Sequence, residues 1–157
     1  MSAVTGLERA LQKTYHWLDE LGSELGWDDR QHCYAALRAV LHALRDRLGV
    51  DEAADLAAQL PLLVRGIYYE GWNPSGTPQR IRHKEEFLEP IRKALAGETG
   101  SEPEEAARAV FALLARHLSA GEMLDVVGVL PAEIRELFPP ALLGSWREGQ
   151  ELATARA

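Results

Sequence analysis

The sequence contains a tandem repeat. Residues 17–68 align with residues 87–138 without a gap when the chain is shifted by 70 positions. The identical pairs include Arg38/Arg108, Ala39/Ala109, Val40/Val110, Leu44/Leu114, Leu48/Leu118, Glu52/Glu122, Asp55/Asp125, Leu60/Leu130, Pro61/Pro131 and Arg65/Arg135. Conservative pairs lie among them, namely Trp17/Phe87, Leu21/Ile91, Val64/Ile134, Ile67/Leu137 and Tyr68/Phe138. One such unit is too small to bury its own apolar face well, so the repeat predicts two units that stack around one core.

Apolar residues recur at spacings of three and four throughout the chain, which is typical of amphipathic helices. No alternating run of useful length indicates a β-strand, so the sequence predicts an all-α fold with roughly four helices in each unit. The expected helices cover about residues 6–25, 29–48, 51–59, 61–70, 83–96, 102–118, 120–129, 131–138 and 141–151. We expect residues 153–157 to form a frayed tail.

Residues that favour helix ends support this assignment. The expected N-terminal caps are Thr5, Asp28, Asp51, Ser101 and Ser119, three of them in capping-box patterns with Glu8, Glu104 and Glu122. Pro61 and Pro131 suit a first helical turn, and Gly97 suits the position after a helix end. The inner face of the first helix is expected to consist of Leu7, Leu11, Tyr15, Leu18, Leu21 and Leu25.

A segment rich in glycine and proline separates the two repeats. Residues 71–82 contain Gly71, Pro74, Gly76 and Pro78, a composition that excludes a regular helix. The single helical domain, residues 1–157, then divides into a first repeat of about 6–70, the linker 71–82, a second repeat of about 83–138 and a C-terminal short helix and tail, 139–157. Aromatic side chains lead into the linker, so we expect it to pack against the body of the protein.

Charge and composition exclude several classes of function. The formal net charge of −7 disfavours nonspecific nucleic acid binding, which needs a cationic field. The sequence has no apolar run of about 18 residues and no signal-peptide core in residues 1–13, which predicts no membrane span and no export. Cys33 is the only cysteine, which excludes an intrachain disulfide and suits a reducing cytosol. We therefore expect a cytoplasmic protein with neither nucleic acid nor membrane as a partner.

A basic cluster ends the linker. Arg80, Arg82, His83 and Lys84 stand next to an expected helix N-terminus, where side-chain charge and free backbone N–H groups attract phosphate or carboxylate. The cluster is therefore a candidate anion-binding site. The alternative is that these side chains pair with acids of the same chain, such as those at positions 85, 86 and 89.

An aromatic cluster begins the linker. Tyr68, Tyr69 and Trp72, with Arg65 nearby, have the composition of a protein interface and also of a small-molecule pocket. Simple packing of the linker against the body is a further interpretation. Aromatic residues at such a junction favour packing first, a protein interface second and a ligand pocket third.

Two arginines and one aspartate recur in both repeats, which indicates the same structural role in each. The set comprises Arg38, Asp55 and Arg65 with their counterparts Arg108, Asp125 and Arg135. We expect arginine–aspartate bridges between the second, third and fourth helices of each repeat. The functional alternative is a pseudo-symmetric ligand site between the repeats.

The sequence predicts no metal, cofactor or catalytic centre. Asp28 with His32, and His42 with Asp46, each provide two ligands on one helix, whereas zinc needs three or four. No glycine-rich phosphate loop, nucleophile elbow or zinc-binding signature is present. Cys33 lies on an amphipathic helix, where a covered thiol is unreactive.

Two stretches of the sequence are similar to a known family. Residues 59–72, QLPLLVRGIYYEGW, and residues 82–87, RHKEEF, combine a Leu-Pro helix start, an Arg-Gly-Ile-Tyr-Tyr turn and a Gly-Trp linker. They resemble the bacterial DUF2267 family, over about residues 12–138. The resemblance implies a small all-helical cytoplasmic protein without an established activity, and it transfers no catalytic or ligand residues.

The sequence favours a noncatalytic protein-interaction or self-association module, in which the linker and its flanking helices contact a protein partner or a second copy. The alternative is a binder of an anionic small molecule at Arg80, Arg82, His83 and Lys84. An enzyme of unknown type is the third hypothesis.

Overall fold

The computed structural model describes residues 2–97 and 102–157, and in these ranges it is all-helical, as the sequence predicts. The helices are α1 (Thr5–Leu25), α2 (Arg30–Arg47), α3 (Val50–Gln59), α4 (Leu62–Tyr69), α5 (Lys84–Ala94), α6 (Pro103–His117), α7 (Ala120–Val129), α8 (Ala132–Arg135) and α9 (Pro140–Ala155). A short 3₁₀ turn, Pro74–Gly76, lies within the linker. None of the described helices is long and apolar enough to cross a bilayer.

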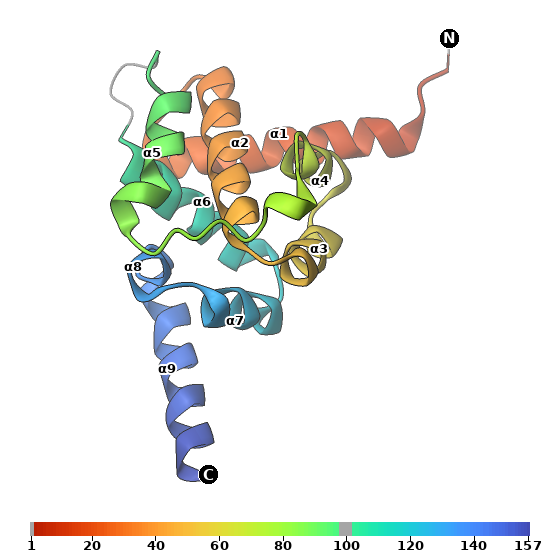
Figure 1. The fold of residues 1–157 in the computed structure, drawn as a ribbon. Coiled ribbons are helices and arrows are strands. Elements are labelled where there is room, and N and C mark those ends of the chain that lie inside the picture. Colours follow the sequence, from red (N-terminus) through yellow and green to blue (C-terminus); the bar gives the residue numbers. More distant parts are fainter. Residues whose placement is uncertain (1, 98–101) are drawn as a thin grey trace.

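Helices α2 and α6 form the centre of the fold. They contact each other, and α1 and α5 pack against both of them (Figure 1). Leu37, Val40 and Leu41 of α2 are completely buried, as are Val110 and Phe111 of α6. Burying a side chain of this size contributes about 1.5–3 kcal/mol. The core therefore depends on the apolar stripes of these two helices.

The contacts between the two halves of the chain are reciprocal. Helix α1 of the first half packs on α6 of the second, and α5 of the second half packs on α2 of the first. Helices α3 and α7, which occupy corresponding places in the two halves, pack against each other. These contacts join the halves into one helical domain.

Two helices extend from this body, at opposite ends of the molecule (Figure 1). The first half of α1 projects on one side, so Leu7, Leu11 and Tyr15 are exposed and the predicted inner face is wrong for these three residues. Helix α9 contacts α7 and continues to Ala155, so residues 153–155 do not form the expected frayed tail.

Several helix ends differ from the expected ones by one or two residues. Asp29, not Asp28, caps α2 by accepting a hydrogen bond from the N–H of Gln31. Gly49, not Asp51, occupies the cap position of α3, which places Asp51 in the first turn. Pro61 and Pro131 stand at the cap positions of α4 and α8 rather than inside the first turn.

The expected capping boxes also differ. Thr5 is the first residue of α1 rather than its cap. Ser119 caps α7, and its hydroxyl accepts a hydrogen bond from Glu122 N, but Gln59 binds the Ser119 N–H in place of the Glu122 carboxyl. Helix α5 ends at Ala94, and Gly97 does not adopt the positive φ expected of a helix-ending glycine. The proposed cap Ser101 lies outside the described residues.

Candidate functional site

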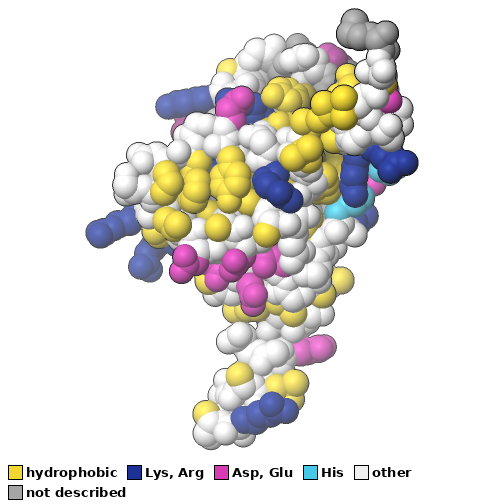
Figure 2. Space-filling view, turned by 90° about the vertical axis from the view of Figure 1, so that its right-hand side faces the viewer, with side chains coloured by type: hydrophobic (Ala, Val, Ile, Leu, Met, Phe, Trp, Pro, Cys, Tyr) yellow, Lys and Arg dark blue, Asp and Glu magenta, His cyan; other side chains and the backbone are white. Residues whose placement is uncertain are grey.

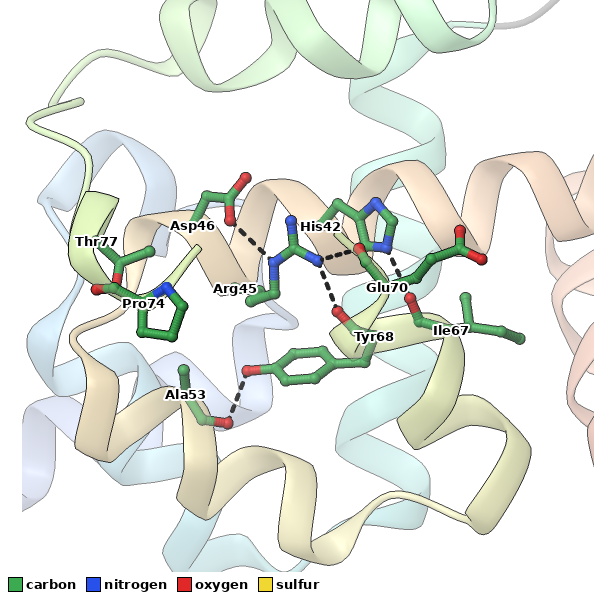
Figure 3. Close-up of polar contacts among 9 residues, drawn as sticks. All are labelled: His42, Arg45, Asp46, Ala53, Ile67, Tyr68, Glu70, Pro74 and Thr77. Carbon is green, nitrogen blue, oxygen red and sulfur yellow. Dashed lines mark hydrogen bonds and ion pairs between the residues drawn. The ribbon is translucent and has the colours of Figure 1, made fainter. Parts of the chain in front are cut away.

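One arginine of α2 holds the start of the linker. Arg45 is only 4% exposed, and its Nε donates to Asp46 Oδ1 at 2.9 Å. Its Nη1 donates to the backbone carbonyls of Tyr68, at 2.9 Å, and Glu70, at 2.7 Å (Figure 3). Because α4 ends at Tyr69, these carbonyls lack helical partners and accept the guanidinium instead.

Two further bonds fix the rest of the linker to α2. The N–H of Gln79 donates to the backbone carbonyl of Asp46 at 2.8 Å, and Arg47 Nε donates to the carbonyl of Ile81 at 2.6 Å. Burial lowers the pKa of Arg47, and the nearby charge of Arg82 lowers it further. The linker therefore packs on the body, as its aromatic residues predict.

The aromatic cluster is mostly directed inward. Tyr68 is completely buried, and its hydroxyl donates to the carbonyl of Ala53 at 2.8 Å. Burial raises the pKa of this hydroxyl far above its usual value. Tyr69 and Trp72 are partly buried, with ring centroids 5.2 Å apart. The prediction that Tyr68 lines an interface or pocket is therefore wrong, whereas Tyr69 and Trp72 keep some accessible surface.

The basic cluster divides into paired and unpaired cations. His83 Nδ1 lies 2.6 Å from Glu133 Oε2, and Lys84 Nζ lies 2.9 Å from Glu104 Oε1. Hydrogen bonding to these carboxylates raises the pKa of both basic groups. Their partners belong to α8 and α6 and not to the first turn of α5. Arg80 and Arg82 are exposed, so anion binding by the cluster now depends on these two residues.

The repeated arginines Arg65 and Arg135 bind backbone carbonyls. Arg65 Nε donates to Ala57 O and its Nη2 to Leu60 O, both at 2.9 Å. Arg135 makes the corresponding bonds, 70 positions later, to Val127 O at 3.0 Å and Leu130 O at 2.6 Å. Ala57 O and Val127 O also accept from the backbone N–H of Leu60 and Leu130. Each guanidinium therefore adds side-chain donors to the carbonyls at the end of α3 or α7, where helical donors run out.

The predicted bridges to Asp55 and Asp125 are therefore wrong. The other repeated pair of arginines also binds elsewhere: Arg38 Nε lies 2.7 Å from Glu70 Oε1, and Arg108 Nε lies 3.0 Å from Glu104 Oε2. Arg108 is exposed and Arg38 is partly exposed. Ion pairs of this kind at the surface contribute about 0–1 kcal/mol.

We expect Arg135→Ala to lower the free energy of unfolding by about 1–3 kcal/mol, because two carbonyls lose a charged donor. The guanidinium also stacks over Trp146, with Cζ 3.9 Å from the ring centroid, and that contact disappears as well. Urea denaturation measures the change. The matched control is Arg147→Ala, which removes an exposed arginine from α9. Equal losses in the two variants would contradict a capping role for Arg135.

The described residues include a partly open cavity between α2, the linker and α5. It has a volume of about 260 Å³, and its polar wall comes from one face of α2 and the linker, with Arg38, His42, Asp46 and Gln79. Its apolar lining comprises Ala39, Ala43, Ile81, Phe87, Pro90 and Ala94. The sequence signal was the i, i+4, i+8 spacing of residues 38, 42 and 46. From the sequence we considered His42 and Asp46 as half of a metal site and Arg38 as part of an ion pair.

His42 has a fixed tautomer in this cavity. Its Nε2 lies 2.6 Å from the carbonyl of Ile67 (Figure 3), and because a carbonyl only accepts, Nε2 carries the proton. Burial lowers the pKa of the imidazole, and the cations of Arg45 and Arg38 lower it further. His42 is therefore neutral at pH 7, with Nδ1 as a hydrogen-bond acceptor. The described residues contain no group of three or more side chains suited to a metal ion.

An acidic cluster lies where α3 meets α7. Its members are Glu52 and Asp55 from α3 and their repeat counterparts Glu122 and Asp125 from α7. Burial raises the pKa of Glu122 to about 7, and repulsion by Asp55, Glu52 and Asp125 adds to this shift. Burial likewise raises the pKa of Glu52, with contributions from Asp125, Asp55 and Asp51. The repeat alone did not predict this cluster, because it does not tell which helices face each other.

The projecting half of α1 exposes several large apolar side chains. Leu7 is 58% exposed and Leu11 is 45% exposed, with Val4 and Tyr15 also exposed. Figure 2 shows hydrophobic side chains gathered on the face that carries this end of the molecule. Large apolar side chains that gather on one exposed face commonly mark an interaction site. Periodicity predicted this stripe correctly but did not show that the body leaves it uncovered.

Comparison with known proteins adds a family. The model of the family described as "Uncharacterized conserved protein (DUF2267)" matches residues 14–137. No curated protein matches the chain.

Proposed function

The chain belongs to the DUF2267 family of uncharacterised conserved proteins, and we propose that it is a noncatalytic module that associates with a second copy through the projecting half of α1. The single observation that carries this proposal is an apolar seam on α1 that is covered in its second half and exposed in its first.

The seam has the spacing of a helix that packs against another helix. Its positions alternate by three and four residues and are Val4, Leu7, Leu11, Thr14, Leu18, Leu21 and Leu25. Thr14, Leu18 and Leu21 are buried in the body, whereas the three positions before them are exposed. A sustained 3–4 alternation of this kind is the pattern with which two helices interlock their side chains. The first half of the seam therefore lacks only a partner helix.

A second copy is the occupant that a self-complementary seam favours. In a twofold arrangement each copy contributes the same patch, so one contact covers both exposed seams. When two α1 helices run antiparallel with Leu11 against Leu11, Leu7 of each copy meets Tyr15 of the other.

The apolar area continues onto α4. Leu62 and Leu63 at the start of α4 are exposed, and α4 contacts α1. These two side chains extend the surface beyond a single helix. A wider surface supports a stable dimer better than one narrow helical stripe does.

The proposal also treats the chain as two copies of one helical unit. The corresponding bonds of Arg65 and Arg135 support it, as do the reciprocal contacts of α1 with α6 and of α5 with α2. Helix α5 begins at Lys84, which corresponds to Thr14 in the first repeat. The first nine residues of α1 therefore have no helical counterpart in α5. The exposed seam is thus an addition to the unit rather than part of its core.

Light scattering coupled to size-exclusion chromatography tests self-association. We expect the wild-type chain to show twice its 17.4 kDa mass, and Leu7→Ser with Leu11→Ser to show the monomer mass. The control is Val129→Ser with Leu152→Ser, which alters exposed apolar residues of α7 and α9 and leaves the dimer intact. A monomeric wild type at high concentration would sink the proposal, as would a dimeric Leu7 and Leu11 variant.

A second candidate, binding of an anionic small molecule at the linker, keeps support from Arg80 and Arg82, which are exposed. The pKa of Arg47, which burial lowers and Arg82 lowers further, agrees with a concentration of positive charge there. A phosphate titration followed by the thermal midpoint tests it. Protection that survives Arg80→Ser with Arg82→Ser would contradict this site.

A further inference from the structure

A second cavity of the described residues lies beside α7 and α9, on the far side of the α3–α7 junction from the linker. Its volume is about 410 Å³. It is lined by Glu52, Leu124, Asp125, Gly128, Val129, Ser145, Trp146, Gly149 and Gln150. Gly128 lies against the indole, and a Cβ at this position would make ordinary van der Waals contact with Trp146 Nε1, at 3.5 Å. The cavity thus combines two carboxylates, an indole and small or polar side chains.

The carboxylates of this cavity have no counter-charge. Glu52 and Asp125 line it, and Asp55 and Glu122 belong to the same cluster. Within residues 2–97 and 102–157, no ion pair joins these four acids to a basic side chain. Four acids held together without a cation repel one another, so a positively charged ligand at this place relieves repulsion.

A buried carboxyl of the cluster also lacks a donor. Glu122 is only 8% exposed, and its Oε1 has no hydrogen-bond partner in the described part of the chain. Glu52 Oε2, on a residue that lines the cavity, is likewise buried without a partner among those residues. Buried carboxyl oxygens normally accept hydrogen bonds, so two of them without donors indicate that the cluster accommodates one from outside the chain.

The chemistry of the cavity indicates an organic cation. The described residues offer no cluster of ligands for a metal ion, whereas an indole beside carboxylates suits an alkylammonium group. The indole of Trp146 already stacks with a cation on one face, the guanidinium of Arg135, whose Nε and Nη2 donate to the carbonyls of Val127 and Leu130. A linear amine has methylene groups for the apolar lining and ammonium groups for the two acids.

We propose that this cavity binds a linear polyamine, with Glu52 and Asp125 holding its ammonium groups and Trp146 packing against its methylene chain. The site is remote from the exposed seam of α1 and does not depend on self-association. It assigns a ligand to Asp125, which the sequence predicted to form an internal bridge with an arginine.

Isothermal titration of the full chain with spermidine at low ionic strength tests this assignment. We expect a saturable isotherm with one site per chain. In the double variant Glu52→Gln with Asp125→Asn we expect the affinity for spermidine to fall by a factor of about ten or more. The matched control is Glu148→Gln with Glu151→Gln, which removes two exposed acids of α9 and keeps wild-type affinity. Far-UV circular dichroism checks that all variants remain helical.

Two outcomes would overturn the proposal. One is an equal loss of affinity in the control variant, which would show that spermidine responds only to net charge. The other is a heat of binding that potassium chloride or magnesium chloride reproduces at the same ionic strength, which would show screening or a metal ion in place of an amine. Butylamine as titrant is expected to bind more weakly than spermidine, because it supplies one ammonium group for two carboxylates.

Discussion

Replacing Glu122 by glutamine will raise the free energy of unfolding at pH 8 and flatten its dependence on pH. The ordinary glutamate pKa is 4.5, and burial among acids raises the pKa of Glu122 to about 7. Between these two pH values the folded chain binds more protons than the unfolded chain, so stability falls as pH rises. The fall is complete once pH exceeds the folded pKa, and a shift of this size corresponds to about 3 kcal/mol.

Glutamine has the size of glutamate but does not ionise, so the variant avoids this loss. Its amide also provides a donor to the neighbouring acids. Urea denaturation at pH 5, 6, 7 and 8 measures the effect, with the wild type losing stability across the series and Glu122→Gln losing much less. A residual slope is expected from Glu52, whose pKa burial and its acidic neighbours also raise. Parallel curves for the wild type and the variant would show that Glu122 is ionised throughout.

Replacing Arg45 by alanine will destabilise the fold by about 3–5 kcal/mol, the loss typical of breaking a buried charged network from one side. The carbonyls of Tyr68 and Glu70 lose their donor, and Asp46 loses its counter-charge. Arg45→Lys keeps the charge, but one ammonium group cannot reproduce the guanidinium fork, so an intermediate loss is expected. Chemical denaturation measures both variants.

The control for Arg45 is an arginine whose partners are on the surface. Arg92 pairs with Glu85 and Glu89 on the exposed face of α5. Arg92→Ala is expected to change stability by about 0–1 kcal/mol. Hydrogen exchange adds a local measurement, because the N–H of Gln79 binds the backbone of α2 beside Arg45 and is expected to exchange faster in Arg45→Ala. An Arg45 variant as stable as the Arg92 variant would contradict this role.

The sequence predicted the helices well, because periodicity and end residues are local properties. The helix boundaries moved by only one or two residues where two candidates for a cap were adjacent, as with Asp28 and Asp29. Whether the body covers the apolar face of α1 is not a local property of the sequence. Leu11 and Leu18 occupy the same seam, yet only Leu18 is covered, because coverage depends on where α2 and α6 end in space.

The candidate sites were predictable to a smaller extent. Identical positions in the repeat marked Arg65 and Arg135 as equivalent, and their contacts correspond. Their acceptors were missed because every residue has a backbone carbonyl, so this kind of bond leaves no signature in the sequence. Asp55 and Asp125 were predicted to pair with these arginines because an arginine and an aspartate recur together in each repeat. Their actual neighbours are acids of the other half, brought near by the packing of α3 on α7.

The projecting half of α1 contributes little to the core. Residues before Thr14 bury little surface in the body, and the family match begins at residue 14. Substitutions in this arm are therefore expected to leave the stability of the core unchanged, and in the self-association proposed above they alter the contact with the second copy.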